Sequence, residues 1–320
     1  MNQYKNLFES IEINGLTLEN RLVMTPMGTN FGEQNGEMSF LHMDYYERRV
    51  QGGYRLLIVE NACVKYPEGS NGTTQLRIDA DNYIPRLYKL CETIHQYGAK
   101  IAIQLNHAGA SALESRIGMQ PVSASNLPNK ECGAIPRKLS VEEIYSIADD
   151  YATSAKRAQT IGFDAIEIHA GHSYLISQFL SPLTNDRTDE FGGNIANRAR
   201  FAKIIVEKVR KVVGPRFPVI IRISADEFLD GGNILEDSIE WLKYFVKEVD
   251  MIDVSVGLSD SIHKQIDASY YPDGWRRYMA RAIKEVFPDK IVMTSGNICN
   301  PQSACEILEN QDADLIGMGR

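Results

Sequence analysis

The chain has 320 residues, with 34 lysines and arginines against 42 aspartates and glutamates and a formal net charge of -8. This length suits one large α/β domain or two ordinary domains, and a negative charge without a basic run excludes a typical nucleic-acid binder. The start of the chain has no apolar segment behind a basic end, and no run of about 18 apolar residues follows, which predicts a cytoplasmic protein that does not enter the membrane.

The cysteines give no sign of a metal centre. They are odd in number and scattered, and no two of them form the C-x-x-C pair that is typical of zinc and iron–sulfur sites. We therefore expect unpaired cysteines in a reducing compartment and no metal site in this chain. The cysteines are Cys63, Cys91, Cys132, Cys299 and Cys305.

Short β-branched apolar runs alternate with longer helical patterns, which indicates βαβ units and a parallel sheet. Ahead of them, Asn14-Gly15 between alternating apolar residues predicts an N-terminal β-hairpin that plugs the bottom of the fold. About eight runs in a chain of this size predict a (β/α)8 TIM barrel, and no run is followed by the G-x-G-x-x-G of a doubly wound sheet. The runs begin near Arg21, Arg55, Lys100, Phe163, Phe217, Asp250, Lys290 and Ala313.

Helical patterns lie between the runs, and two of them have clear start signals. Ser140 with Glu143 forms a capping box, and Pro301 after Asn300 is a first-turn proline. The proline-rich segment 119–137 predicts a long loop that serves as a lid. Arg320 follows the eighth run directly, so we expect the last helix of the barrel to be missing from this chain. The expected helices cover 40–51, 81–97, 140–160, 194–213, 236–247, 275–286 and 301–310.

The polar residues that end the runs should meet, because a barrel of this kind has its active site at the carboxyl ends of the strands. They combine neutral hydrogen-bonding groups, two histidines, a tyrosine and two arginines with few carboxylates. That mixture is typical of a site for a planar heteroaromatic ligand that carries a phosphate. The set includes Pro26, Met27, Gly28, Glu60, Asn61, Gln104, His169, His172, Tyr174, Arg222, Gly296, Asn297, Gly319 and Arg320.

Two features of this set indicate an anion. The glycines in TSGN and MGR place backbone N–H groups where they can close on a phosphate, and Arg320 adds a charged fork; the alternative is that these glycines only make turns. Arg222 lies inside the apolar run VIIRIS, where an unpaired guanidinium is costly. It should face an anion or an electron-rich ring, or else form a structural ion pair within the barrel.

With these motifs the chain resembles the old yellow enzyme family of FMN-dependent ene-reductases. The resemblance covers essentially the whole chain in order, through PMGT, IQLNHAG, HAGHSYLISQFLSPLTNDRTDEFGG, NRARF, VIIRIS, SGNI and MGR. It looks most similar to the bacterial enoate reductase and 2,4-dienoyl-CoA reductase branch. Members of that branch often carry a 4Fe-4S segment and an FAD module towards the C-terminus. We therefore expect residues 1–320 to be a single FMN-binding barrel domain, the N-terminal part of a longer protein.

The resemblance implies a role for each predicted site residue. Pro26, Met27 and Gly28 would line the flavin; Asn61 and Gln104 would hydrogen-bond its ring; and Arg222 would lie beside the N1/C2 edge. The ribityl phosphate would be held by Gly296, Asn297, Gly319 and Arg320. His169 and His172 would donate hydrogen bonds to the carbonyl oxygen of an enone, enoate or enoyl-CoA, and Tyr174 would deliver a proton to Cα. NADH or NADPH would supply the hydride.

These groups suit the chemistry, because two fixed N–H donors stabilise an enolate as an oxyanion hole does, and a phenol is a ready acid at neutral pH. The alternatives for the two histidines are a cap on the turn or a metal site. For the protein, the alternatives are an amine dehydrogenase, an NADH oxidase or a non-catalytic flavin electron-transfer module. Gly28-Thr29 replaces the flavin-modulating cysteine of some relatives. We expect segment 260–274 to shape the mouth of the substrate site, although its residues cannot be assigned one by one. The role of Glu60, the exact substrate and homo-oligomer formation stay open.

Overall fold

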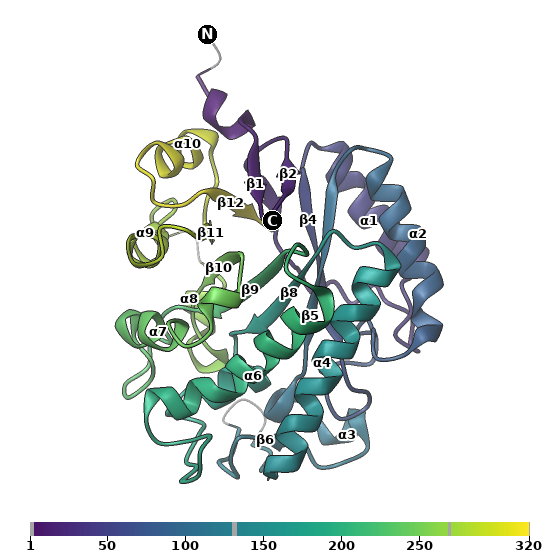
Figure 1. Cartoon of the computed structure of the whole chain (residues 1–320), viewed down its shortest axis with the longest axis vertical. Helices are drawn as coiled ribbons and strands as arrows, with labels where there is room; N and C mark the ends of the chain where they lie inside the picture. Colours follow the sequence, from purple (N-terminus) through teal and green to yellow (C-terminus); the bar gives the residue numbers. More distant parts are fainter. Residues whose placement is uncertain (1–2, 130–132, 268–269, 320) are drawn as a thin grey trace.

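The computed structural model describes residues 3–129, 133–267 and 270–319. Eight parallel strands close into a barrel in the order β10-β11-β12-β3-β4-β5-β8-β9, so the predicted (β/α)8 fold is confirmed (Figure 1). Each predicted run forms one barrel strand. The strands are β3 (Leu22–Met24), β4 (Leu56–Cys63), β5 (Lys100–Asn106), β8 (Ala165–Ala170), β9 (Val219–Ser224), β10 (Met251–Ser255), β11 (Ile291–Ser295) and β12 (Leu315–Met318).

The helices lie on the outside of the barrel and largely match the predicted ranges (Figure 1). The Ser140–Glu143 capping box starts the longest of them, and Asn300 caps the helix that begins at Pro301. The main helices are α1 (Phe40–Gln51), α2 (Ile84–His95), α4 (Val141–Ile161), α6 (Ile195–Val213), α7 (Leu235–Leu242), α9 (Arg277–Val286) and α10 (Pro301–Glu309); the short ones are α3 (Glu114–Ile117), α5 (Leu175–Leu180) and α8 (Ile262–Gln265).

Two helices differ from their predicted ranges for local reasons. The pattern that begins at Asp81 starts as a 3-10 turn, Asp81–Tyr83, and becomes α-helical only at α2, where Pro85 occupies the first turn. Proline fits a first turn because its nitrogen has no hydrogen to donate. α7 ends at Leu242, before the expected end, and the chain then turns so that Phe245 stacks on Trp241 with ring centroids 5.8 Å apart.

The N-terminal hairpin plugs the barrel as predicted. β1 (Ile11–Ile13) pairs with β2 (Leu16–Leu18) in antiparallel register, and Asn14 and Gly15 adopt positive φ in the turn between them. Buried Ile13 and Leu18 join one apolar cluster with inward-facing residues of all eight strands. The strand residues of that cluster are Val23, Leu56, Ile58, Ala102, Ala165, Ile220, Met251, Met293 and Leu315.

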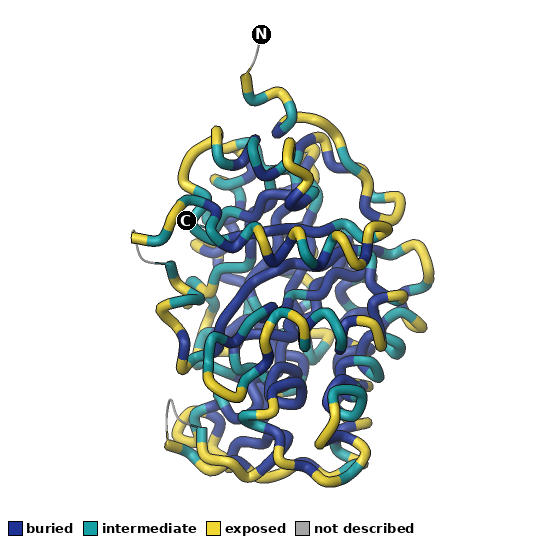
Figure 2. The backbone as a smooth tube through the Cα atoms, turned by 90° about the vertical axis from the view of Figure 1, so that its left-hand side faces the viewer, coloured by how far each residue is buried: buried dark blue, intermediate teal, exposed yellow. Residues whose placement is uncertain are grey.

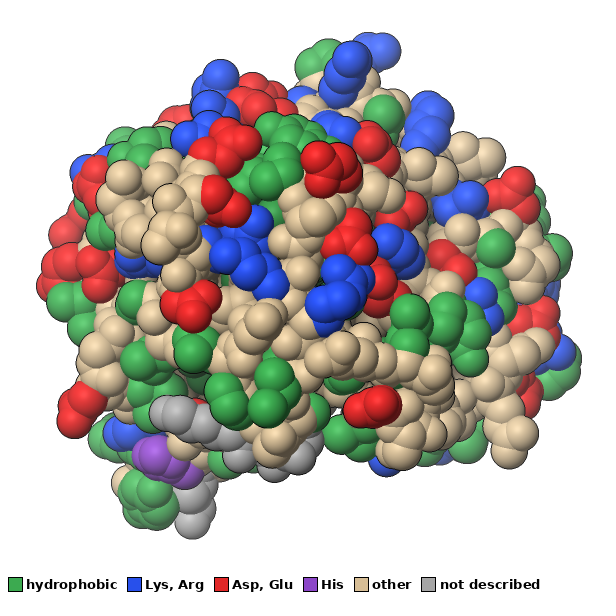
Figure 3. All heavy atoms as spheres, turned by 90° about the horizontal axis from the view of Figure 1, so that it is seen from below, with side chains coloured by type: hydrophobic (Ala, Val, Ile, Leu, Met, Phe, Trp, Pro, Cys, Tyr) green, Lys and Arg blue, Asp and Glu red, His purple; other side chains and the backbone are tan. Residues whose placement is uncertain are grey.

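Burial follows the layers of the fold. The strands and the inner faces of the helices are buried, while exposed residues concentrate on the outer faces and loops (Figure 2). The predicted lid segment contains β6 (Val122–Ser123), which pairs in parallel with β7 (Arg137–Lys138); residues 130–132 lie outside the described ranges. The face in Figure 3 intersperses basic and acidic side chains without an extended patch of one sign.

The described residues contain neither a membrane-spanning helix nor a cluster of metal-binding side chains. No helix there is long and apolar enough to cross a bilayer. Within the same ranges, no cluster of three or more His, Cys, Asp or Glu side chains could hold a metal ion.

Candidate active site

Two adjoining cavities open at the carboxyl ends of the barrel strands. The larger has a volume of about 360 Å³ and the smaller about 220 Å³, and Met27, Arg222 and Gln265 line both. Every predicted site residue that the structure describes lines one of them, and Arg320 lies outside the described residues. The larger cavity takes Pro26, Gly28, Asn61, Gln104, His169, His172 and Tyr174, and the smaller takes Gly296, Asn297 and Gly319.

The predicted catalytic residues form one cluster at the end of β8. The rings of His169 and His172 meet edge to face with centroids 5.0 Å apart, and the ring of Tyr174 lies 4.9 Å from that of His169. Nε2 of His169 and Nδ1 of His172 are 3.3 Å apart. The two nitrogen atoms are close enough to bind a single ligand oxygen between them.

The backbone that presents this cluster is unusual. His172 and Ser173 both lie in the left-handed region, with φ of 57° and 63°. Non-glycine residues there cost of order 1 to 3 kcal/mol each, and they persist where the surrounding structure holds them. The preceding Gly171 leaves no room for a side chain, because a Cβ would lie 2.8 Å from Oγ of Ser224 on the next strand. The same Ser224 oxygen accepts a 3.0 Å hydrogen bond from the His172 N–H, which fixes the turn.

Both histidines are neutral in this environment. Burial lowers the pKa of each well below its usual range, and the charge of Arg222 lowers both further. Nδ1 of His169 accepts a 3.4 Å hydrogen bond from the Gly171 N–H, so its proton belongs on Nε2. Nε2 of His172 lies 2.8 Å from Oγ of Ser255, and a serine hydroxyl can donate or accept there. With its proton on Nε2, His169 donates to Nδ1 of His172 at 3.3 Å, and a ligand oxygen between the two rings would take that N–H instead. If Ser255 then donates to Nε2 of His172, the proton of His172 lies on Nδ1 and both rings present an N–H to that oxygen.

Tyr174 is held in place by a side chain from a distant segment of the chain. Its hydroxyl oxygen accepts a 2.9 Å hydrogen bond from Nδ2 of Asn71, a residue far away in sequence that also lines the cavity. Such a donor orients the phenol and stabilises the oxygen when it gives up its proton. Asn71 was not predicted as a site residue, because it follows no strand end.

The wall of the barrel below the larger cavity carries more charge than the sequence predicted. Gln104 donates a 2.7 Å hydrogen bond to Glu167, and Arg222 Nε lies 3.4 Å from Asp253, an ion-pair distance without a hydrogen bond. Glu167 and Asp253 are fully buried. Burial raises the pKa of Glu167 well above its usual range and the neighbouring Asp253 raises it further, which favours the neutral acid. Arg222 therefore has the ion-pair partner that one prediction gave it. It also lines both cavities, where the other prediction placed it against an anion or a ring.

Glu60 lines the larger cavity and also anchors a neighbouring loop. It lies at a β-bulge, where Glu60 and Asn61 of β4 face the single residue Gln104 between neighbouring pairs of β5, and this irregularity directs both side chains. The Glu60 carboxylate accepts hydrogen bonds from the Thr29 backbone N–H at 3.1 Å and its hydroxyl at 2.8 Å, and it meets Nε2 of His42 at 2.9 Å. It therefore anchors the loop that places Gly28 in the cavity.

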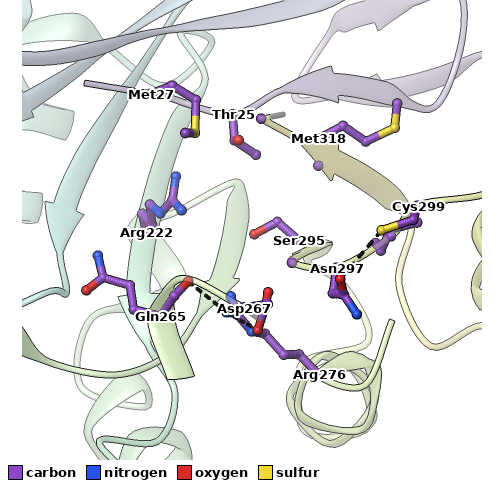
Figure 4. Close-up of a pocket in the computed structure, with 14 residues that line it drawn as sticks. Thr25, Met27, Arg222, Gln265, Asp267, Arg276, Ser295, Asn297, Cys299 and Met318 are labelled. Carbon is purple, nitrogen blue, oxygen red and sulfur yellow. Dashed lines mark hydrogen bonds and ion pairs between the residues drawn. The ribbon is translucent and has the colours of Figure 1, made fainter. Parts of the chain in front are cut away.

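The smaller cavity also contains a charged residue, Arg276, that was not among the predicted site residues. Figure 4 shows Arg276 and Asp267 on one side of this cavity, facing Arg222 and the end of β11. Gln265 and Ile266, from α8 and the residue after it, line the larger cavity, so the predicted mouth segment 260–274 does contribute to the site; residues 268–269 of it lie outside the described ranges. Arg276 lies in the turn before α9, and no periodicity or strand end marks it.

Comparisons with known proteins identify the family of this chain. Residues 6–320 match the model of the NADH:flavin oxidoreductase / NADH oxidase family. The chain is 39% identical to an NADH oxidase of Thermoanaerobacter brockii, over 100% of this chain and 49% of that protein. It is 38% identical to an NADPH dehydrogenase of Bacillus subtilis (strain 168), over 99% of this chain and 90% of that protein. The solved structure of an old yellow enzyme homologue from Zymomonas mobilis matches with a TM-score of 0.84 and 26% identity, over 98% of this chain and 88% of that one.

The lengths of these relatives differ. The chain spans about half the length of two of the curated relatives it matches and nearly all of others. The family match nevertheless covers almost every residue, including both cavities. The chain therefore belongs to the NADH:flavin oxidoreductase / NADH oxidase family, that is, to the old yellow enzyme family of flavin-dependent oxidoreductases.

Proposed function

We propose that this chain binds FMN and reduces the C=C bond of an α,β-unsaturated carbonyl compound with hydride derived from NADH or NADPH. The observation that carries the proposal is the close approach of His169 and His172, whose facing nitrogens are 3.3 Å apart beside Tyr174 in the larger cavity. Flavin binding alone does not need two neutral N–H donors and an acid at one point. Reduction of a conjugated carbonyl needs both.

The residues present fit FMN. The larger cavity offers amide side chains and the fork of Arg222, whose buried Nε has no hydrogen-bond partner among the described residues. The adjoining smaller cavity has glycines at the ends of β11 and β12, where backbone groups can approach a phosphate closely. Asn61, Gln104 and Arg222 would hold the ring, with Pro26, Met27 and Gly28 beside it, and Gly296, Asn297, Gly319 and Arg320 would hold the phosphate. When bound, FMN supplies the hydride.

The histidines act on the substrate carbonyl. Hydride addition at the β carbon drives negative charge onto the carbonyl oxygen, and two N–H donors already fixed around that oxygen stabilise it without rearranging. Because both rings are neutral, they donate without giving up a full proton. Removing one donor of this kind typically costs about 3 to 4 kcal/mol in the transition state.

Tyr174 completes the reaction by protonating Cα. Its phenol is close to His169, and the hydrogen bond from Asn71 compensates the oxygen when the proton leaves. Positioned acids of this kind contribute about 100- to 10,000-fold. The balance is one hydride to the β carbon and one proton to the α carbon, which together saturate the double bond.

A second candidate function is NADH oxidation with oxygen as the acceptor, because the relative from Thermoanaerobacter brockii is named an NADH oxidase. In that case His169 and His172 would not hydrogen-bond a substrate carbonyl oxygen. The chain would then consume NADH in air at the same rate with or without an enone.

The test is an anaerobic reoxidation experiment. We expect the purified protein to be yellow and to release FMN on denaturation. After stoichiometric reduction by dithionite, the flavin should be reoxidised by members of a panel of enones, enoates and enoyl-CoA esters, with the saturated compound as product. A protein that takes up no FMN, or a reduced flavin that only oxygen reoxidises, would contradict the proposal. Saturated analogues of the same compounds are the matched controls.

A further inference from the structure

Arg276 is a buried cation on the wall of the smaller cavity. Only 2% of its surface is exposed, and it comes from the turn before α9, not from a strand end. Its Nη2 shares two N–H groups among three acceptors, the backbone oxygens of Lys264 and Gln265 and, at 2.7 Å, Oδ1 of Asp267. Asp267 is itself fixed by a 2.8 Å hydrogen bond from the Trp275 indole N–H. The guanidinium therefore has one fixed orientation.

The rest of this guanidinium faces the end of β11. A Cβ on Gly296 would lie 2.6 Å from Nη1 and 2.8 Å from Nε of Arg276, so the guanidinium packs directly on the glycine backbone. Gly296 also has a φ of 105°, which a side chain would strain. Nε of Arg276 is buried and has no hydrogen-bond acceptor among the described residues. A buried donor without an acceptor is costly, and here it borders an open cavity.

Arg222 lines the same cavity from β9 (Figure 4). Burial lowers the pKa of Arg276, and the charge of Arg222 lowers it further, so the two cations oppose each other. Each has one buried carboxylate partner, Asp253 for Arg222 and Asp267 for Arg276. An anion in the cavity would relieve the repulsion and accept a hydrogen bond from the free Nε of Arg276.

We propose that Arg276 binds the phosphate group of the cofactor and makes the site select phosphorylated flavin. The proposal rests on the proposed function, in which the two cavities hold FMN. The evidence is the fixed guanidinium, its unpaired Nε and its contact with Gly296. The same side chain holds the carbonyl groups of Lys264 and Gln265, so it also ties the phosphate end of the site to the segment that lines the larger cavity.

The experiment separates phosphate binding from this second, purely structural role. The apoprotein is titrated with FMN and with riboflavin, which has the same ring and no phosphate, and quenching of flavin fluorescence gives both dissociation constants. For Arg276→Met we expect FMN affinity to fall roughly 10- to 100-fold, as for loss of a charge-assisted hydrogen bond, with riboflavin changed less than about threefold. Arg276→Lys should fall between wild type and Arg276→Met, because a lysine keeps the charge without the fork.

Arg277→Met is the matched control, because that neighbouring arginine lines neither cavity and pairs outside with Glu306 and Asp312. It should leave both affinities unchanged. Equal losses for FMN and riboflavin in the Arg276 variants would show that Arg276 only holds the loop, and the inference would fall while FMN binding by wild type stood. If wild type bound neither flavin, the proposed function and the inference would fall together. If Arg276→Met does not fold, the ratio of the FMN and riboflavin dissociation constants is measured on Arg276→Lys instead.

Discussion

The two ends of the barrel interior are built from the same strands with opposite chemistry. At the amino ends of the strands, the inward-facing residues are apolar and pack against the hairpin. Two residues further along several strands the inward-facing residues are polar, and most of these line the cavities. That step is roughly 7 Å, since a strand rises about 3.3 Å per residue. Ala102 gives way to Gln104, Ala165 to Glu167 and then His169, and Ile220 to Arg222. The comparison teaches that each strand contributes to stability at one end and to the site at the other.

The largest effect should come from breaking the plugged end. Leu18→Asp places an unpaired carboxylate in the cluster of Ile13 and the strand residues, where Leu18 is 1% exposed. We expect a loss of about 5 kcal/mol or more in the free energy of unfolding, measured by urea denaturation, because packing is lost and a charge is buried. Leu18→Ala should lose about 2 to 5 kcal/mol. A loss below about 1 kcal/mol for Leu18→Asp would show that the hairpin does not stabilise the barrel.

A change at the open end should affect chemistry and not folding. His172→Ala removes one of the two donors, so we expect flavin reoxidation by cyclohexenone to slow roughly 100- to 1,000-fold and phenol, an enolate mimic, to bind more weakly. The measurement is stopped-flow reoxidation with phenol titration of the oxidised flavin. His172→Asn is the matched control, because asparagine tolerates the left-handed φ of 57° and keeps a donor. Unchanged phenol affinity in His172→Ala would show that the histidines only stabilise the turn and do not bind the ligand oxygen.

Tyr174→Phe should separate the proton donor from the carbonyl site. We expect reoxidation by cyclohexenone to slow about 100-fold, since a positioned acid is lost, while phenol affinity falls much less than in His172→Ala. Reduction of the flavin by the nicotinamide should stay intact. Equal phenol affinities in the two variants, both far below wild type, would contradict this division of labour.

A smaller effect is expected at Ser255, which faces Nε2 of His172 at 2.8 Å. We expect Ser255→Ala to weaken phenol binding roughly tenfold, because the variant lacks the hydroxyl that can donate to Nε2 of His172 and so place its proton on Nδ1, beside the ligand. Thermal unfolding should stay close to wild type, and Ser255→Thr should restore phenol binding because it restores the hydroxyl. Wild-type phenol affinity in Ser255→Ala would remove Ser255 as a positioning residue.

The smallest effect should come from Glu167→Gln. The folded-state pKa of Glu167 is raised, so its contribution to stability is complete below the unfolded pKa of about 4.3 and is lost as pH rises through the folded value. Glutamine keeps the oxygen that Gln104 binds and does not titrate. We expect a difference below about 1 kcal/mol in the free energy of unfolding at pH 5, with the glutamine variant gaining on wild type towards pH 9. A growing deficit of that variant at high pH would show that Glu167 is ionised.

The sequence by itself determined the strands, the hairpin and the membership of the two cavities. These follow from local periodicity, from the Asn14-Gly15 turn and from the rule that the carboxyl ends of barrel strands converge, so His169, Arg222 and Gly296 could be grouped before any coordinate was known. Their separation in sequence does not affect this grouping, because the carboxyl ends of all the parallel strands lie at one face of the barrel.

Only the tertiary structure decided which partners those residues have. The bulge that turns Glu60 towards Thr29 and His42, the hydroxyl of Ser255 beside His172, and the guanidinium of Arg276 on Gly296 all depend on register and on the path of a loop. The structure also places two buried carboxyl groups below the cavity, Glu167 beside Gln104 and Asp253 beside Arg222. Such contacts join residues distant in sequence within a few ångströms, and no periodicity in the sequence encodes a distance of that kind.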